Sequence, residues 1–570
     1  MVVGHATVIA MTVAVLGLIS AVGAGRWIAS NEGPTEWAHA LVAGLLLWGL
    51  VGLGLGALGL ITPLAFGAVG AVSLLGWTRG RLTRPAWATI AVSACLVFPG
   101  LIDALGPIMG TDEQYLHVGL PQQLLMHGEL VGGPLHPNGS RPLLLQLVYT
   151  GLLSSGESRS LACFHWLLSV STVALVIQMG RHRLGGWNIG VLAASMLALS
   201  TTFQESTGQA ASDFPTAFAV LVAIDAVATG RHRSAMLAAA AAISIKYTAV
   251  APLAGILLTA GLRPLLAGRL AVGALLLVSP WWLRNAWNDL HPLFPFMGWP
   301  DPQFSFQFAE KWGAGRSLID FLYLPYRAVF DADPNTHLFH GRIHPLLILC
   351  LLPVPLAWRS RTLRPWFGAA ALGLIGWAAG PHWLRYLIPT LPIVALLGAA
   401  VVIPLASGRW RRFGLIAALL CWAPSGLKGM EGRWSETRVA FKDGLPAPAE
   451  AIEFCNQHLP DDATVALLFD WNSAAIHRRQ VLGSVEDHNP SRHFFLRHAD
   501  DPIGALVRQG ATHAVVRTVN FPKSHYEFLD PNRYKQEFTA PLKTMNHSLL
   551  MEAELLYTGP LHRVYRLPTD

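Results

Sequence analysis

Long apolar stretches recur along this chain, and short segments rich in arginine separate many of them. A helix that crosses a bilayer needs about 20 mostly apolar residues, and about 14 stretches approach that length. Only 13% of the 570 residues are charged, against roughly 25% in soluble domains. We therefore expect an α-helical polytopic membrane protein and exclude a soluble enzyme, a disordered chain and a disulfide scaffold. The stretches lie near residues 6–25, 37–55, 57–77, 86–104, 160–180, 186–203, 212–229, 234–247, 248–262, 268–283, 344–358, 365–380, 384–405 and 412–426.

The arginine clusters predict the orientation, because Lys and Arg gather in cytoplasmic loops. When the apolar stretches alternate in direction, every cluster falls on one side, which we assign to the cytoplasm. The net charge of +7 thus follows from topology, and we expect no nucleic-acid partner. The clusters are Arg79, Arg81 and Arg84; Arg181 and Arg183; Arg231 and Arg233; Arg263 and Arg269; Arg359, Arg361 and Arg364; and Arg409, Arg411 and Arg412.

Three regions follow from this topology. Residues 1–84 form transmembrane helices of unassigned role, residues 85–426 a transmembrane module, and residues 427–570 a small extracytoplasmic α/β domain. The module has two long outer loops, 105–159 and 284–343. We expect short surface helices in the first loop around 121–126 and 142–153, and a broken helix pair at 234–262. In the last region we expect helices at 447–458 and 502–509 and strands at 463–470, 513–518, 554–558 and 562–567.

Ionisable groups near membrane depth are costly and are therefore functional candidates. Asp112 and Glu113 are adjacent at the start of the first outer loop, where carboxylates can act as a general base or share a divalent cation with a phosphate. The alternative is a solvated acidic loop. Asp213 stands where a later helix leaves the outer face. It either caps that helix ahead of Pro215 or faces the first loop across a cavity.

Three cations also stand out. Lys246 interrupts an apolar run, and Arg284 and Arg385 lie at outer helix ends, against the positive-inside trend. An anionic phosphate would satisfy all three, because guanidinium groups bind phosphate through paired hydrogen bonds. Snorkelling of the lysine and contact of the arginines with lipid headgroups are the alternatives.

Other motifs in the sequence give little support for a zinc site or a nucleotide-binding site. His340 and His344 have the spacing of two zinc ligands on a helix, but no HExxH and no third ligand accompany them. The GxGxxG at 54–59 lies in an apolar stretch without a preceding strand, which favours close helix packing over dinucleotide binding. The sequence contains neither a P-loop nor a GxSxG motif.

In combination the motifs resemble the GT-C superfamily of polytopic glycosyltransferases, in particular the glycosyltransferase family 39 or PMT-like group. That group includes protein O-mannosyltransferases and aminoarabinose transferases. The similarity covers roughly residues 85–426, and four apolar stretches precede the acidic loop where the family usually has one. The motifs are, in the family's order, Asp112-Glu113 with Tyr115-Leu116-His117 and Pro121; Asn138 to Pro142; Asp213-Phe214-Pro215; Lys246-Tyr247-Thr248; Trp281-Trp282-Leu283-Arg284-Asn285 with His291 to Pro295; and Arg385-Tyr386-Leu387-Ile388-Pro389.

The resemblance implies transfer of a sugar from a polyprenyl-phosphate-linked donor to an acceptor hydroxyl of a glycan, lipid or protein. Either Asp112, which we favour, or Glu113 would be the general base, and Asp213 would orient the acceptor or help to hold a metal. Only some relatives need Mg²⁺ or Mn²⁺; if this chain does, these three acids are its ligands. The residues implied in binding the donor phosphate are Lys246, Arg284 and Arg385, and the further pocket candidates are Tyr115, His117, Tyr247, Tyr386 and His382.

A single displacement would invert the anomeric centre. Absence of a eukaryotic-type luminal insert and the composition favour a bacterial inner membrane, with the site facing the periplasm. Two other functions stay open at this stage. The chain could be a transporter or lipid-carrier flippase, although inverted repeats are not evident. It could also be a non-catalytic assembly protein of the same fold, although both first-loop acids are present.

Overall fold

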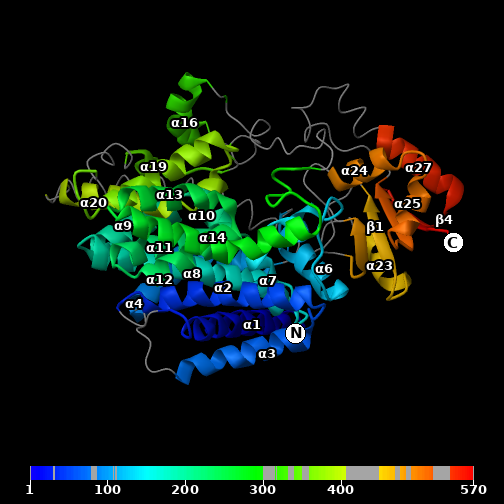
Figure 1. Ribbon diagram of the computed structural model, residues 1–570, viewed down its shortest axis with the longest axis horizontal. Coiled ribbons are helices and arrows are strands. Elements are labelled where there is room, and N and C mark those ends of the chain that lie inside the picture. Colours follow the sequence, from blue (N-terminus) through cyan, green and yellow to red (C-terminus); the bar gives the residue numbers. More distant parts are fainter. Residues whose placement is uncertain are drawn as a thin grey trace.

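A computed structural model describes most of the chain. The described residues are 2–29, 33–78, 86–106, 108, 112–299, 315, 317–331, 339, 341–349, 358–405, 408, 449–468, 476–482, 489–517, 540–560 and 562–568. Within them, a large helical part carries the first outer loop, and a smaller part built on a sheet lies beside helix α6 (Figure 1). The predicted stretch at 412–426, the basic clusters at 79–84 and 409–412, and His340 lie outside the described residues.

Most predicted stretches of the helical part coincide with helices. The helices are α1 (Val2–Gly25), α2 (Glu36–Ala57), α3 (Pro63–Leu74), η1 (Leu75–Thr78), α4 (Trp87–Leu96), α5 (Phe98–Leu105), η2 (Glu113–Gly119), α6 (Leu120–His127), η3 (Pro137–Ser140), α7 (Leu144–Leu153), α8 (Arg159–Arg183), α9 (Trp187–Ala198), α10 (Thr201–Thr207), α11 (Asp213–Ala228), α12 (His232–Ile245), η4 (Tyr247–Ala249), α13 (Val250–Thr259), α14 (Pro264–Trp287), α16 (Leu318–Phe330), α17 (Pro345–Leu349), α19 (Arg364–Ala379), η6 (Leu384–Leu387) and α20 (Leu391–Leu405).

The predicted number of about 14 spanning helices is not confirmed. In the described part of the chain, four helices are long and apolar enough to cross a membrane, or five if the bent pair α4 and α5 is one span. The four are α1, α2, α8 and α14. Several other predicted stretches form shorter apolar helices, because local breaks interrupt them. The expected short helices of the first loop are present as α6 and α7.

The break between α4 and α5 shows how side chains support such an interruption. The two helices meet at an angle of 66°, which leaves carbonyl groups without helical partners. Trp166 donates its indole N–H to the Val97 carbonyl (2.9 Å), and the Gln204 amide donates to the Leu96 carbonyl (2.7 Å). These bonds come from α8 and α10, so tertiary contacts stabilise the bend that leads the chain towards Asp112.

The N-terminal helices belong to the same packed core as the rest of the helical part. Asp225 of α11 is fully buried and accepts hydrogen bonds from Thr35 (2.7 Å), His39 (2.9 Å) and Arg183 (2.6 Å). Farther along α2, glycines 49 and 52 allow close contact with leucines 144 and 147 of α7. Helix α2 therefore supports α7, the helix that follows Arg141 and Pro142.

The C-terminal part is a five-stranded sheet with helices on it. Strands β1 (Thr464–Leu468), β2 (Arg479–Leu482) and β3 (His513–Arg517) are parallel, and β4 (Glu554–Thr558) and β5 (His562–Arg566) complete the order β2-β1-β3-β5-β4 with antiparallel pairing. The four predicted strands and both predicted helices are present; β2 was not predicted. The helices are α23 (Ala449–His458), α24 (Asn489–Arg497), α25 (Pro502–Arg508) and α27 (Ala540–Glu552).

The edge strand β2 docks on α6. Gln123 exchanges two hydrogen bonds with the backbone of β2 and its neighbour, donating to the Arg478 carbonyl (3.2 Å) and accepting from the Gln480 amide (2.9 Å). Arg479 donates to the Met126 carbonyl (3.2 Å). The sheet is thereby attached to the loop that begins at Asp112.

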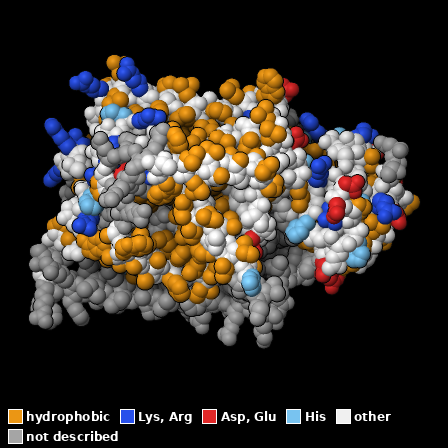
Figure 2. Space-filling view, turned by 90° about the horizontal axis from the view of Figure 1, so that it is seen from below, with side chains coloured by type: hydrophobic (Ala, Val, Ile, Leu, Met, Phe, Trp, Pro, Cys, Tyr) orange, Lys and Arg blue, Asp and Glu red, His pale blue; other side chains and the backbone are white. Residues whose placement is uncertain are grey.

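The surface of the helical part matches a membrane environment. Figure 2 shows hydrophobic side chains spread over one face of it, whereas Lys and Arg gather at one end and charges of both signs cover the C-terminal part at the other. Leu64, Trp87 and Leu265 are each at least 80% exposed. Apolar surface on this scale is buried in lipid or in a partner in stable proteins.

Candidate active site

A cavity of about 230 Å³ lies at the end of α12 and collects residues from six parts of the chain. Asp112 reaches it from the start of η2, a seven-residue π-helix; π-helical turns are rare and frequent at functional sites. The cavity lies at the opposite end of α11 and α12 from Arg183 and Arg231. Its lining residues are Asp112, Leu116, His117, Arg141, Pro142, Gln146, Ala211, Ser212, Asp213, Ile245, Lys246, Tyr247, Thr248, Phe296, Pro381, Arg385 and Tyr386.

Asp112 forms an ion pair with Arg385, and its second carboxylate oxygen accepts a hydrogen bond from the Tyr115 hydroxyl (2.8 Å). Burial alone would raise the pKa of Asp112, but the Arg385 charge and the Tyr115 hydroxyl outweigh burial and lower it to about 2. Arg385 also lies over the Trp383 ring, 4.5 Å from its centroid. Asp112 is therefore an ionised carboxylate that a cation holds in place.

Asp213 and Lys246 form a second pair, with 2.5 Å between the lysine Nζ and the carboxylate. Lys246 takes an extended conformation where α12 ends and η4 begins, so the predicted break in 234–262 places its side chain in the cavity. Its Nζ also lies 4.2 Å from the centre of the Tyr386 ring, a cation–π contact. Asp213 is the first residue of α11, so it also lies in the first turn, where a carboxylate is favoured.

The chain contributes a further cation to the cavity, Arg141, which we did not predict from the sequence. Asn285, which is buried, fixes its segment by donating to the Ser140 carbonyl (2.8 Å) and the Pro292 carbonyl (3.0 Å). Arg284 donates to the Arg141 carbonyl (3.3 Å), and its buried Nη1 has no hydrogen-bond partner among the described residues. Arg284 thus lies behind Arg141 and does not line the cavity itself. The sequence feature that could have indicated this residue is an arginine directly before Pro142 in a predicted outer loop.

Among the described residues that line the cavity, cations outnumber carboxylates. Two carboxylates and three cations line it, and Arg284 adds a fourth cation next to Arg141. Burial lowers the pKa of His117 to about 3, in spite of the nearby Asp112 charge, so this imidazole is neutral at pH 7. Its Nδ1 is buried and has no hydrogen-bond partner. The arrangement suits an anion that also presents hydrogen-bonding groups.

Some predicted residues lie outside the cavity lining. Glu113 is 5% exposed and accepts a hydrogen bond from the Ala210 amide (2.5 Å). His382 donates from Nε2 to the Ala378 carbonyl (2.9 Å) and stacks on Phe339. Tyr115 does not line the cavity either, and its hydroxyl donates a hydrogen bond to Asp112. Tyr247 and Tyr386 line the cavity, and Tyr247 accepts a hydrogen bond from the Trp282 indole (2.9 Å).

The described residues do not offer a metal centre: they contain no group of three or more His, Cys, Asp or Glu side chains that could hold a metal ion. Asp112 and Asp213 each contact a cationic side chain, and Glu113 contacts a backbone amide. This donor set does not fit Mg²⁺ or Mn²⁺, because hard cations need several free carboxylate or carbonyl oxygens.

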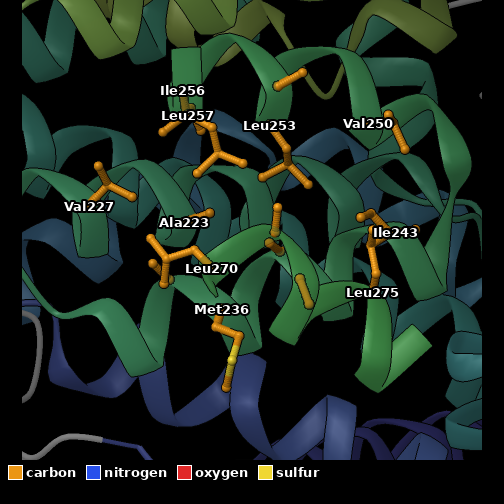
Figure 3. A pocket seen from close by; sticks show the side chains of 15 residues that line it. Ala223, Val227, Met236, Ile243, Val250, Leu253, Ile256, Leu257, Leu270 and Leu275 are labelled. Atoms are coloured by element: carbon orange, nitrogen blue, oxygen red, sulfur yellow. The ribbon is translucent and has the colours of Figure 1, made fainter. Parts of the chain in front are cut away.

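An apolar pocket of about 160 Å³ lies between α11, α12, α13 and α14 (Figure 3). Only apolar side chains line it, among them Ile243, Val250 and Leu253. Ile243 and Val250 flank the Lys246 segment on either side in the sequence, so the apolar pocket begins within a few residues of the polar cavity. We call it the apolar groove.

No family model matches this chain, and no curated protein does. Among solved structures, the chain is similar to the crystal structure of ArnT from Cupriavidus metallidurans bound to undecaprenyl phosphate, with 14% identity, a TM-score of 0.49, and coverage of 84% of this chain and 97% of that one. It is also similar to the apo form of the same protein, with 12% identity, a TM-score of 0.48 and the same coverage. A likeness this distant assigns no role to individual residues.

Proposed function

We propose that this protein is a membrane glycosyltransferase that moves a sugar from a polyprenyl-phosphate-linked donor to an acceptor hydroxyl. The observation that carries the proposal is a single cavity in which two carboxylates, three cations and a neutral histidine meet beside an all-apolar groove. A carboxylate can accept the proton of an attacking hydroxyl, and cations can stabilise a phosphate leaving group.

Charge in the cavity favours a phosphate as the bound anion. Asp112 and Asp213 pair with Arg385 and Lys246, and Arg141 with Arg284 behind it brings two further guanidinium groups to this region. Guanidinium groups match the geometry of phosphate oxygens. The buried Nη1 of Arg284, which has no partner, supplies a donor that an anion would satisfy.

The apolar groove supplies a place for the hydrocarbon of a lipid-linked donor. Its lining is entirely apolar, and two of its residues, Ile243 and Val250, lie three and four residues from Lys246 in the sequence. An isoprenoid chain attached to a phosphate in the cavity would thus have apolar side chains to pack against. A water-soluble nucleotide sugar would leave this groove without an occupant.

Donor binding would also prepare the base. With a pKa of about 2, Asp112 accepts protons poorly while Arg385 holds it. The donor phosphate attracts Arg385, and as the guanidinium turns to the phosphate, the partly buried carboxylate of Asp112 becomes more basic. Asp112 then takes the hydroxyl proton while the acceptor oxygen attacks the anomeric carbon. The bond from this carbon to the phosphate oxygen breaks, and polyprenyl phosphate leaves with the electron pair; the anomeric centre is inverted.

Asp213, held by Lys246, would orient the acceptor from the opposite wall of the cavity. We place the site on the extracytoplasmic face, because Arg183 and Arg231 lie at the other ends of the helices that carry it and basic clusters mark the cytoplasm. For a bacterial chain this is the periplasmic side of the inner membrane. The acceptor is a hydroxyl of a glycan, a lipid or a protein.

Binding of the carrier lipid tests this proposal. Purified protein would be titrated in nanodiscs with a long-chain polyprenyl phosphate and, in parallel, with the polyprenol that lacks the phosphate. We expect selective binding of the phosphate and a clear loss of affinity in Arg141→Gln and Arg284→Gln. Arg508→Gln, which removes an exposed arginine of the C-terminal part, serves as the control. Equal binding of the two lipids would refute a phosphate site.

A further inference from the structure

The loop that leads into Asp213 is held by buried side chains from three other elements. It runs from Gly208 to Ser212 between α10 and α11. Glu113 of η2 accepts a hydrogen bond from the Ala210 amide at 2.5 Å, and His165 of α8 accepts one from the Ala211 amide at 3.3 Å. Tyr149 of α7 donates its hydroxyl to the Ala211 carbonyl at 3.2 Å.

These three side chains are almost completely shielded from solvent. Glu113 is 5% exposed, and His165 and Tyr149 are 0% exposed. Polar groups are buried at a cost unless hydrogen bonds compensate them, and backbone amides in a buried loop likewise need partners. The three side chains and the loop backbone therefore supply hydrogen-bond partners to one another.

The orientation of the His165 ring is consistent with its acceptance of a hydrogen bond from the loop. Its Nε2 lies 3.0 Å from the Ser206 carbonyl, an acceptor, so the proton of the neutral imidazole is assigned to Nε2. Nδ1 is then unprotonated and presents its lone pair to the Ala211 amide. The single imidazole thus bridges the end of α10 and the loop that follows it.

The position of the contacts in the sequence connects the two acids of the cavity. Glu113 follows Asp112 directly, and the loop contacts at Ala210 and Ala211 end two residues before Asp213. Ala211 and Ser212 line the cavity together with both acids. The bond between Glu113 and Ala210 thus joins the segment of one acid to the segment of the other from behind the cavity.

We propose that Glu113 and His165 are positioning residues that fix the loop 208–212 and thereby hold Asp213 across the cavity from Asp112. On this account Glu113 is not the base. The statement about the reaction depends on the proposed glycosyltransferase function, whereas the statement about the loop does not.

Hydrogen exchange tests the loop directly, followed by mass spectrometry of peptides that span 206–212 in the full-length protein. Glu113→Ala removes the acceptor, so exchange of these amides should accelerate about tenfold, as expected when a buried hydrogen bond is lost. Glu113→Gln keeps an acceptor oxygen and should retain protection. Glu157→Ala is the matched control, because Glu157 also accepts a backbone amide, that of Arg159, at a site away from the cavity.

His165 is tested in the same way. His165→Asn keeps an acceptor near the position of Nδ1 and should preserve protection, whereas His165→Phe should lose it. Unchanged exchange in both Glu113→Ala and His165→Phe would overturn the proposal, whatever the protein catalyses.

Turnover separates positioning from proton transfer. If Glu113 positions the loop, Glu113→Gln keeps kcat within a few-fold of the wild type while Glu113→Ala lowers it. A Glu113→Gln protein that keeps its loop protection but has lost turnover would show that Glu113 is the base and would overturn the assignment. If the wild type has no transferase activity, the proposed function fails, and the exchange experiment still decides the structural claim.

Discussion

Replacement of Asp112 by asparagine should separate donor binding from turnover. In the free protein Asp112 pairs with Arg385, and we infer that the donor phosphate competes with Asp112 for this guanidinium. Asp112→Asn removes the competitor and leaves Arg385 available to the phosphate. The variant should therefore bind the donor at least as tightly as the wild type, although it has lost the base.

The expected changes in donor affinity and in kcat follow from the pKa of Asp112 and from its role as the base. The pKa of Asp112 is lowered from 3.8 to about 2, and each pH unit corresponds to about 1.4 kcal/mol of interaction with the ionised form. The net preference for the ionised form, to which Arg385 and Tyr115 contribute and which burial opposes, is of the order of 2 kcal/mol, so we expect donor affinity to rise by up to roughly 30-fold when Arg385 is released. Loss of a general base lowers kcat by about 10² to 10⁴.

Two assays check this prediction on the same preparations: equilibrium titration with a polyprenyl-phosphate sugar, and release of polyprenyl phosphate under saturating donor. Tyr115→Phe is the matched variant, since it removes a hydrogen bond to the same carboxylate (2.8 Å) but keeps the charge, and it should reduce kcat only modestly. A tenfold loss of donor affinity in Asp112→Asn would refute competition for Arg385. Wild-type turnover in that variant would refute the role of Asp112 as base.

Three further predictions concern other parts of the molecule. Lys246→Gln should destabilise the protein by about 3 kcal/mol, because it leaves Asp213 buried without its cation, and adding Asp213→Asn should restore part of this loss; additive losses in thermal unfolding would contradict a coupled pair. Ala239→Trp, which places bulk in the apolar groove, should weaken binding of a long-chain donor more than binding of a short-chain analogue. Equal losses of affinity would show that the lipid tail does not bind in this groove. Burial lowers the pKa of His136, which contacts the Gln480 backbone, to about 4, so docking of the sheet should be fully stable above pH 6.5 and weaken as the pH falls towards 4, by at most about 1.4 kcal/mol per pH unit. Limited proteolysis across this range should show the change in the wild type and a flatter response in His136→Gln.

Helix positions were predictable from the sequence because apolar runs specify them directly. Helix lengths were not, because breaks such as the bend at Val97 depend on donors from distant helices, here Trp166 and Gln204. The strands of the C-terminal part were found wherever an apolar run marked them. Strand β2 was missed because its four residues, Arg479–Leu482, carry two polar side chains and form an edge whose pairing needs α6.

Candidate residues of the cavity were predictable for a related reason. Charged side chains such as Asp112, Lys246 and Arg385 stand out where the surroundings are apolar, since their burial demands a partner. Their partners were not predictable, because the pairing of Asp112 with Arg385 joins residues that are far apart in the sequence. Arg141 was missed because arginines are common in loops, and only the structure shows that Asn285 fixes this loop.

Donor consumption by the purified protein tests the central claim most directly. The wild type and Asp112→Asn would be incubated with a mixed pool of polyprenyl-phosphate sugars and membrane extract as a source of acceptors, and mass spectrometry would follow free polyprenyl phosphate. We predict that one donor disappears, that free carrier phosphate accumulates with the wild type, and that the asparagine variant releases almost none. An intact donor pool with the wild type, or equal release by both proteins, would contradict a glycosyltransferase that uses Asp112 as its base.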